Sequence, residues 1–401
     1  MEAILVTRQI PVWQDRRAIA LLMAASLTTM ANATIAPALP GLERLFADDP
    51  NAALLTRLLV PAPSLSVAIF APLAGIAADR IGRRRLLLFG VILFVLSGSA
   101  GLVLPDLPTI FASRLVLGIA VALIMTAQTA LIGDYFSGDD RNALTGLQIS
   151  ARNLGGLVFI LTAGWVATIS PRLPFAIYAL AAAFLPLMWL VIVDLPRLSP
   201  AGANLAGPGD EQSGWRLPLA LLVLLQGATN MIFFVMPTQL SFFLDAQGYD
   251  SAIMTGSALG VLMLSGGGFA LLYQRIQRAI GYAGIFALGY GTMALGFLVL
   301  VLAATTPAIF TAVAAIGAGY ALVSPSFVAL ALNLAPAQKR GLAGGILTAS
   351  IFIGQFCSPL ISTPLIAGHG YASLFGGTAM ALAVLTVAAL LAGGADKLRR
   401  R

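Results

Sequence analysis

Residues 75–85 read Gly-Ile-Ala-Ala-Asp-Arg-Ile-Gly-Arg-Arg-Arg and form a short charged segment between two long apolar stretches. The stretches are residues 52–78 and 86–104, each long enough for a membrane-crossing helix, which needs about 20 mostly apolar residues. Because the charges gather in the connection, the segment is predicted to be a tight loop at a membrane surface. The flanking chain is therefore predicted to lie in lipid.

The same alternation of apolar runs and short charged connections extends over the whole chain. Of its 401 residues, 59% are hydrophobic and 10% are charged, whereas an ordinary soluble domain has roughly a quarter charged residues. The apolar runs predict an all-α membrane protein with about twelve transmembrane helices, and the internal repeat described below predicts that they form two pseudo-symmetric six-helix bundles. The predicted spans are residues 17–39, 52–78, 86–104, 107–131, 143–168, 172–193, 217–243, 252–274, 281–304, 306–332, 342–367 and 371–395.

Positive residues lie mainly in alternate connections, which predicts a multi-pass protein with both termini in the cytoplasm. The formal net charge of +7 is spread over these short inner segments, so it indicates contact with anionic membrane lipid and no nucleic-acid partner. The inner positive residues are Arg8, Arg16, Arg17, Arg80, Arg83, Arg84, Arg85, Arg141, Arg197, Arg216, Arg275, Arg278, Lys339, Arg340, Lys397, Arg399, Arg400 and Arg401.

The chain divides into two related halves. Residues 194–215 are rich in Pro, Gly, Ser and charge, which predicts a cytoplasmic linker between a bundle at 1–193 and a bundle at 216–401. Asp140-Arg141 before the fifth span corresponds to Lys339-Arg340 before the eleventh, and Pro37 corresponds to Pro237. Gly146 and Gly155 recur at the same offset as Gly345 and Gly354. Such matches indicate a duplicated bundle with a substrate site at the interface of the halves.

The segment 75–85 resembles the G-x-x-x-D-R-x-G-R-R/K signature of the loop between the second and third helices in the major facilitator superfamily. Arg114, Gly118 and Ala122 resemble that family's fourth-helix pattern, and Gly354-Gln355-Phe356 resembles the eleventh helix of bacterial efflux permeases. The resemblance implies a transporter of the drug:proton antiporter type in a bacterial inner (plasma) membrane. It also implies alternating access between the two halves.

The loop motif has its own physical logic. Gly75 and Gly82 permit close helix approach and a tight turn, and Asp79 can accept hydrogen bonds from a helix N-terminus such as that at residues 341–345. The resemblance implies that this contact latches the cytoplasmic side in the outward-facing state. The alternative is that the arginines of the loop only enforce topology. The predicted gating set is Gly75, Asp79, Arg80, Gly82, Arg83 and Asp134.

Two arginines lie inside predicted spans, where an ionisable group costs about 2.5 to 3.5 kcal/mol on insertion scales. Arg152 is near the middle of the fifth span, and a guanidinium there can bind a carboxylate or phosphate of a substrate. The alternative is a structural arginine bonded to backbone carbonyls or to Gln128 and Gln148. Arg114 lies in the outer third of the fourth span, where snorkelling is easier, and packing against a neighbouring helix is an equal interpretation.

Four more polar residues near the middles of spans complete the predicted substrate-binding set with Arg152: Asn32, Asn230, Tyr320 and Gln355. Each singly is more typical of a hydrogen bond between helices, but as a set they favour a pocket. Phe233 and Phe234 beside Asn230 are candidates for an apolar wall or for packing.

Acidic residues are absent from the middles of the predicted spans. All 16 lie in predicted loops or near helix ends, although a proton-coupled carrier commonly uses a carboxylate at the membrane midplane. The fifth span also lacks the full G-P-x-x-G-G ending of the antiporter motif. The proton site therefore stays unassigned among Glu43, Asp79, Asp134, Asp245 and His369.

Enzyme function has little support, because one cysteine and one histidine provide no metal cluster and no evident catalytic pair. No cofactor or metal is predicted. The first hypothesis is a monomeric secondary active transporter that carries out proton-coupled efflux of a small organic molecule. The expected partners are this substrate, with an anionic or amphipathic character, and protons. The alternatives are an organic-anion facilitator or symporter anchored by Arg152 and a non-transporting membrane receptor.

Overall fold

The structure is a computed structural model that describes residues 12–194, 214–302, 305–336 and 339–399, and this part of the chain contains helices without a strand. The α-helices are α1 (Arg16–Ala33), α2 (Leu39–Leu45), α3 (Ala52–Leu58), α4 (Ala62–Ile81), α5 (Arg83–Ser99), α6 (Leu107–Tyr135), α7 (Gly138–Ala167), α8 (Pro174–Ile177), α9 (Leu185–Val191), α10 (Arg216–Phe233), α11 (Val235–Ala246), α12 (Ser251–Leu302), α13 (Thr306–Leu334) and α14 (Arg340–Arg399). Short 3₁₀ segments cover Val12–Gln14, Ala36–Ala38, Ala100–Leu102 and Tyr178–Phe184.

Ten segments of the described chain are long and apolar enough to cross a membrane. Two of them, Ser251–Leu302 and Arg340–Gly393, have 52 and 54 residues, about twice the length of a single crossing. Each contains a glycine at positive φ, Gly281 at 71° and Gly370 at 76°, a backbone conformation that other residues rarely adopt. These glycines divide each long segment into two helices, so the ten segments provide twelve crossings and the predicted fold class is confirmed.

The first and seventh crossings are broken in the same way. The first, Arg16–Leu45, passes from α1 through the 3₁₀ turn that contains Pro37 into α2. The seventh, Arg216–Ala246, changes from α10 to α11 at Phe234, three residues before Pro237. Proline cannot donate the backbone hydrogen bond of a helix interior, so a break at or before it is expected.

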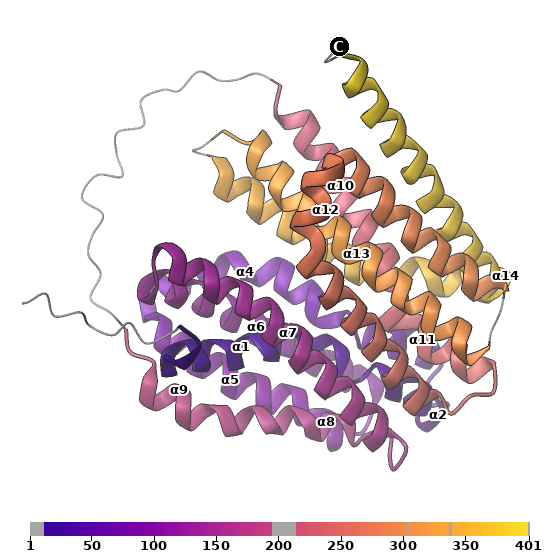
Figure 1. Cartoon of the computed structure of the whole chain (residues 1–401). Helices are drawn as coiled ribbons and strands as arrows, with labels where there is room; N and C mark the ends of the chain where they lie inside the picture. Colours follow the sequence, from indigo (N-terminus) through magenta and orange to yellow (C-terminus); the bar gives the residue numbers. More distant parts are fainter. Residues whose placement is uncertain (1–11, 195–213, 303–304, 337–338, 400–401) are drawn as a thin grey trace, which may run out of the picture.

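Close glycine contacts also repeat between the halves. A β-carbon built at Gly155 of α7 would lie 2.7 Å from the Ser26 β-carbon of α1, and one built at Gly354 of α14 would collide with the backbone of Gly227 in α10. The fifth crossing thus packs on the first as the eleventh packs on the seventh. Figure 1 shows the helices before residue 194 and those after residue 214 as two groups.

Some predicted features lie outside the described residues. The central part of the predicted linker, residues 195–213, is among them, as are Arg8, Arg197, Arg400 and Arg401. The domain boundaries at 193/194 and 215/216 therefore stay predictions.

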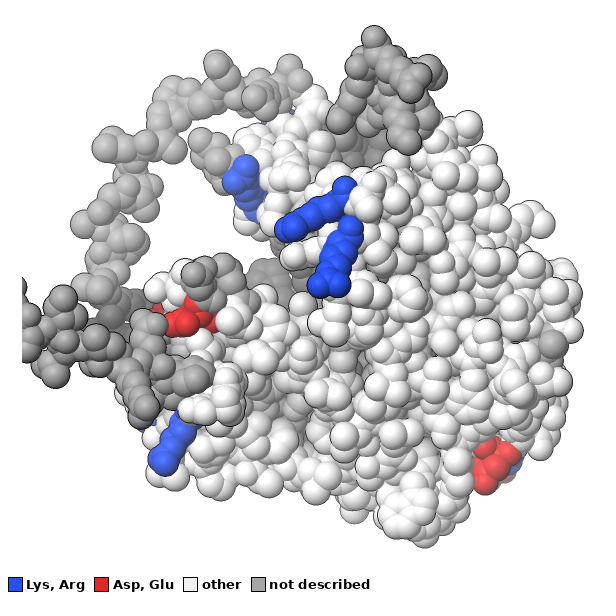
Figure 2. Space-filling model, in the orientation of Figure 1, with Lys and Arg blue, Asp and Glu red and all other residues white. Residues whose placement is uncertain are grey.

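The outer surface of the described chain is suited to lipid. Large apolar side chains such as Leu190, Leu271 and Leu302 are 78%, 80% and 74% exposed. On the face shown in Figure 2, charged side chains lie toward the two ends of the helices, and the broad surface between them is uncharged. Such a surface would be unstable in water but matches the hydrocarbon core of a bilayer.

Candidate functional site

A cavity of about 650 Å³ lies between the two groups of helices, a size suited to a drug-sized molecule. Its walls come from both halves of the chain, and they combine apolar side chains with a few polar ones. Four residues of the predicted substrate-binding set line it: Asn32 of α1, Arg152 of α7, Tyr320 of α13 and Gln355 of α14.

The fifth predicted binding residue, Asn230 of α10, is not among the residues that line the cavity. It is fully buried behind the wall, where its Oδ1 accepts a hydrogen bond of 2.8 Å from the Tyr320 hydroxyl. The Tyr320 ring stacks on Phe233 with ring centroids 3.9 Å apart and an interplanar angle of 15°. Asn230 therefore positions an aromatic pair that faces the cavity, and Phe234 lines the cavity beside it.

Arg152 is the one charged residue among the described residues that line this cavity. Its Nε is buried without a hydrogen-bond partner, and neither Gln128 nor Gln148 bonds to it. Gln128 instead donates to the Leu21 carbonyl at 2.7 Å. Among the described residues, Arg152 therefore makes none of the hydrogen bonds that the structural alternative predicts, to backbone carbonyls or to Gln128 and Gln148.

Arg114 of α6 has different surroundings, because it is fully buried in the first half and does not snorkel. Its Nε donates to the Leu59 carbonyl at 3.2 Å, and its Nη2 donates to the Ala31 carbonyl. The guanidinium also lies 5.0 Å from the centre of the Tyr178 ring. Arg114 thus joins three parts of the first half and lies outside the cavity.

Gly118, one turn after Arg114, lies where α6 approaches α4 closely. A β-carbon built there would lie 2.7 Å from both the Pro63 Cα and the Ser66 Cβ. The predicted fourth-helix motif is therefore a packing unit in this structure.

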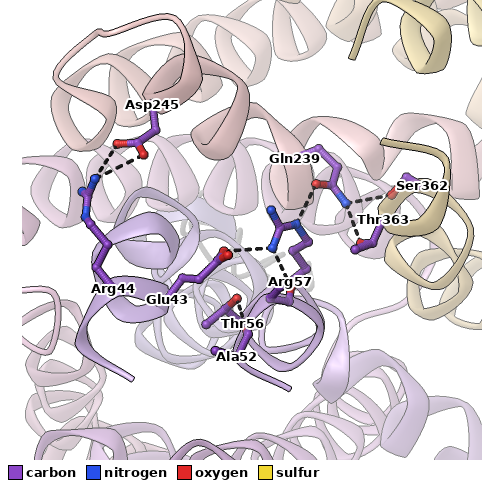
Figure 3. A network of polar contacts seen from close by, with 10 residues as sticks. Glu43, Arg44, Ala52, Thr56, Arg57, Gln239, Asp245, Ser362 and Thr363 are labelled. Atoms are coloured by element: carbon purple, nitrogen blue, oxygen red, sulfur yellow. Dashed lines mark hydrogen bonds and ion pairs between the residues drawn. The ribbon is translucent and has the colours of Figure 1, made fainter. Parts of the chain in front are cut away.

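One end of the interface between the halves is closed by a polar network that the sequence did not single out (Figure 3). Arg57, at the end of α3, donates to Glu43 of α2 at 2.8 Å and to the Gln239 side chain of α11 at 3.2 Å. Gln239 in turn donates to Ser362 and Thr363 of α14 at 2.8 and 3.1 Å. The Arg57 guanidinium also lies over the Phe242 ring at 3.7 Å.

Two further contacts join the halves toward this end. Arg44 and Asp245 form an ion pair of 3.0 Å at the surface. Ser64 of α4 donates to Gln355 of α14 at 2.6 Å beside the cavity. Residue-by-residue inspection misses such contacts, because their partners are up to 291 positions apart in the chain.

The predicted gating set lies at the opposite end. β-Carbons built at Gly75 of α4 and at Gly341, Gly344 and Gly345 of α14 meet nothing within 4 Å. These glycines are therefore not packed against a neighbouring helix in this conformation, and the contact predicted for Asp79 stays a prediction. Polar contacts of Arg57 and Arg44 join the halves at one end of the interface.

Within the first half, the loop of the gating set is firmly held. Arg83 forms an ion pair with Asp134 of α6. Gly82 adopts a φ of 101°, and a β-carbon there would lie 2.7 Å from an oxygen of Asp194. That carboxylate accepts from the Arg84 backbone amide at 2.8 Å, at the start of α5. Asp79 and Arg80 are exposed beside this turn.

The described residues contain no group of His, Cys, Asp and Glu that could hold a metal ion. The described lining of the cavity contains no carboxylate either. The arrangement is that of a binding cavity between the two halves, with a polar network closing one end of the interface.

The comparisons with known proteins agree with this geometry. The family model of the Major Facilitator Superfamily matches residues 21–336. Quinolone resistance protein NorA of Staphylococcus aureus (strain COL) is 23% identical over 343 residues, which cover 82% of this chain and 85% of that protein. Multidrug resistance protein 1 of Bacillus subtilis (strain 168) is 26% identical over 314 residues, which cover 74% of this chain and 77% of that protein.

Solved structures share the fold at lower identity. The crystal structure of a D-xylose-proton symporter superposes with a TM-score of 0.73 at 19% identity, covering 92% of this chain and 96% of that one. The crystal structure of the human organic anion transporter MFSD10 (TETRAN) superposes with a TM-score of 0.70 at 18% identity. The match covers 95% of this chain and 100% of that one. With a family model that covers most of the residues, the resemblance predicted from residues 75–85 is confirmed. This chain belongs to the Major Facilitator Superfamily of membrane transporters.

Proposed function

We propose that this transporter exports a small organic molecule from the cytoplasm by alternating access, with proton entry as the driving force. The supporting observation is the cavity between the halves, which the Arg57 network closes at one end. The printed names of the relatives, a quinolone resistance protein and a multidrug resistance protein, support the direction.

We also propose a membrane topology for the chain and an inward-facing conformation for this structure. Both termini lie in the cytoplasm of a bacterial inner membrane, as the positive-inside pattern favours, and the chain acts as a monomer. The Asp79 end then faces the cytoplasm and the conformation is inward-facing. In the outward-facing state, the segment around Asp79 meets the start of the eleventh crossing, while the Arg57 network separates.

A second candidate has its own supporting observation. Because no carboxylate is found in the described cavity lining, the protein lacks a midplane proton acceptor there. An organic-anion facilitator, or a symporter whose substrate carries the proton, needs no such acceptor. Arg152 would anchor the substrate in either case.

Transport by purified protein in proteoliposomes with an acidic interior tests the first proposal. Norfloxacin and ethidium are suitable probes, with protein-free liposomes as the control for passive trapping in the acidic lumen. An exporter coupled to protons accumulates at least one probe above the control, and nigericin abolishes the excess. Equilibration that is independent of the pH gradient favours the facilitator.

The Asp79→Asn variant tests the gate in the same vesicles. The neutral side chain keeps the size of the residue but weakens the acceptor for the helix N-terminus, so transport is expected to fall. Asp140→Asn, an exposed carboxylate on α7, is the matched control. Undiminished transport by Asp79→Asn at equal expression would exclude the gating role.

A further inference from the structure

The two membrane-embedded arginines differ in the acceptors around them. Arg114 donates from Nε and Nη2 to two backbone carbonyls and faces an aromatic ring, so the protein compensates most of its charge, and only its Nη1 is buried without a partner. Arg152 has no hydrogen bond or ion pair with the described residues, and its Nε is buried. A positive charge in a low-dielectric site is costly unless an anion or several acceptors compensate it.

Nothing on the described cavity wall supplies that anion. Arg152 shares the cavity with hydroxyl, amide, aromatic and aliphatic groups, and the described lining contains no carboxylate. The Gln128 amide donates to the Leu21 carbonyl of α1 instead. The described cavity lining therefore carries one positive charge that no described side chain neutralises.

The other residues of the cavity wall indicate the chemistry of the uncharged part of the ligand. The stacked rings of Phe233 and Tyr320 present an aromatic surface, against which a flat or apolar group can pack. Asn32 contributes an amide whose Oδ1 is buried without a donor. The cavity thus offers a positive point, an apolar face and an unsatisfied hydrogen-bond acceptor.

We propose that the substrate is an amphipathic organic anion, whose carboxylate is bound by Arg152 while its apolar body packs on the Phe233–Tyr320 pair. A planar guanidinium forms paired hydrogen bonds with a carboxylate, which a lysine cannot reproduce. This inference rests on the proposed transport function for its biological meaning, but the binding that it predicts is measurable without transport.

Thermal unfolding of the detergent-purified full chain tests the assignment with three probes that share a ring system: 1-naphthoate, neutral 1-naphthamide and cationic 1-naphthylmethylammonium. A ligand that binds the folded state raises the unfolding temperature with its concentration. Naphthoate is expected to stabilise the wild type at lower concentration than either analogue. Arg152→Gln should weaken naphthoate binding roughly 10- to 100-fold, the effect of losing a charge-assisted hydrogen bond.

Two variants make the result specific. Arg152→Lys keeps the charge but loses the paired geometry, and it should bind naphthoate with intermediate affinity. Arg141→Gln removes one positive charge from the exposed part of the same helix, outside the cavity, and should bind like the wild type. Equal loss in Arg141→Gln would show a general charge effect and overturn the assignment.

The remaining outcomes are also decisive. Naphthoate that stabilises the wild type no more than the amide overturns the anionic assignment, as does an Arg152-dependent shift produced by phosphatidylglycerol instead of naphthoate. If norfloxacin or ethidium is still transported in vesicles, transport stands and only the substrate class fails. If naphthoate binding depends on Arg152 but naphthoate, norfloxacin and ethidium are all left untransported in the vesicles, the binding site stands and the exporter proposal fails.

Discussion

Arg114 is a fully buried arginine that acts as a connector between helices. It ties α6 to the Ala31 carbonyl of α1 and to the Leu59 carbonyl after α3. Both carbonyls lie near helix ends or breaks, where the regular hydrogen bonds of a helix are interrupted. A donor that reaches both therefore stabilises the first half of the chain.

Arg114→Met is expected to destabilise the protein, because it keeps the length of the side chain but removes its donors. Each orphaned carbonyl should cost about 1 to 2 kcal/mol, so a total of roughly 2 to 4 kcal/mol is expected. The measurement is the thermal unfolding temperature in detergent. Arg141→Gln, at an exposed position, is the control, and its unfolding temperature should stay close to that of the wild type. An Arg114→Met protein as stable as the wild type would contradict the connector role.

At the scale of elements, glycines decide how closely crossings approach. Gly118 of α6 faces the backbone at Pro63 of α4 without room for a β-carbon. Gly146 of α7 also lies within a helix, but a β-carbon built there meets nothing within 4 Å. Both positions are helical glycines, but Gly118 is tightly packed against a neighbouring helix and Gly146 faces open space.

This contrast predicts opposite effects of the same substitution. Gly118→Ala should destabilise by about 1 to 3 kcal/mol, because a rigid backbone must move to admit the methyl group. Gly146→Ala should be neutral or stabilising by up to about 1 kcal/mol, since alanine favours a helix. Comparison of the two unfolding temperatures provides the test, and a more stable Gly118→Ala would refute the close contact.

At the scale of the whole molecule, two contacts that close the Arg57 end differ in burial. The Arg57 side chain is 11% exposed and has partners on both halves, whereas Arg44 of the Arg44–Asp245 pair is 67% exposed. Solvent and salt screen an exposed pair, so its contribution is small. The buried network around Arg57 is therefore the main closure.

Arg57→Ala is accordingly expected to open this end, and Arg44→Ala to leave it closed. Spin labels at Asp48 and Gln247, two exposed residues near the network on opposite halves, report the separation by double electron–electron resonance. Cys357 is replaced by serine in all variants. Longer distances are expected for Arg57→Ala alone, and an equal shift for Arg44→Ala would assign the closure to the surface pair instead.

The candidate site was only partly predictable from sequence. Arg152 stood out because a charge within an apolar span has a high cost that single-sequence hydropathy reveals. Asn230 and Asn32 are both polar residues near the middle of a predicted span, so the sequence does not distinguish them. In the structure, Asn32 lines the cavity, whereas Asn230 lies behind the cavity wall. The rotation of a helix about its axis decides this difference, and it depends on the neighbouring helices.

The sequence by itself determined the crossings, the resemblance carried by residues 75–85 and the presence of a positive charge within the fifth span. These properties are local, because hydropathy and charge act on each segment as it enters lipid. The tertiary structure alone decided that Arg114 donates to two backbone carbonyls while Arg152 faces a cavity, and that Arg57 and Gln239, 182 positions apart, close one end. Such contacts depend on how two bundles meet, and that changes with conformation while the sequence stays the same.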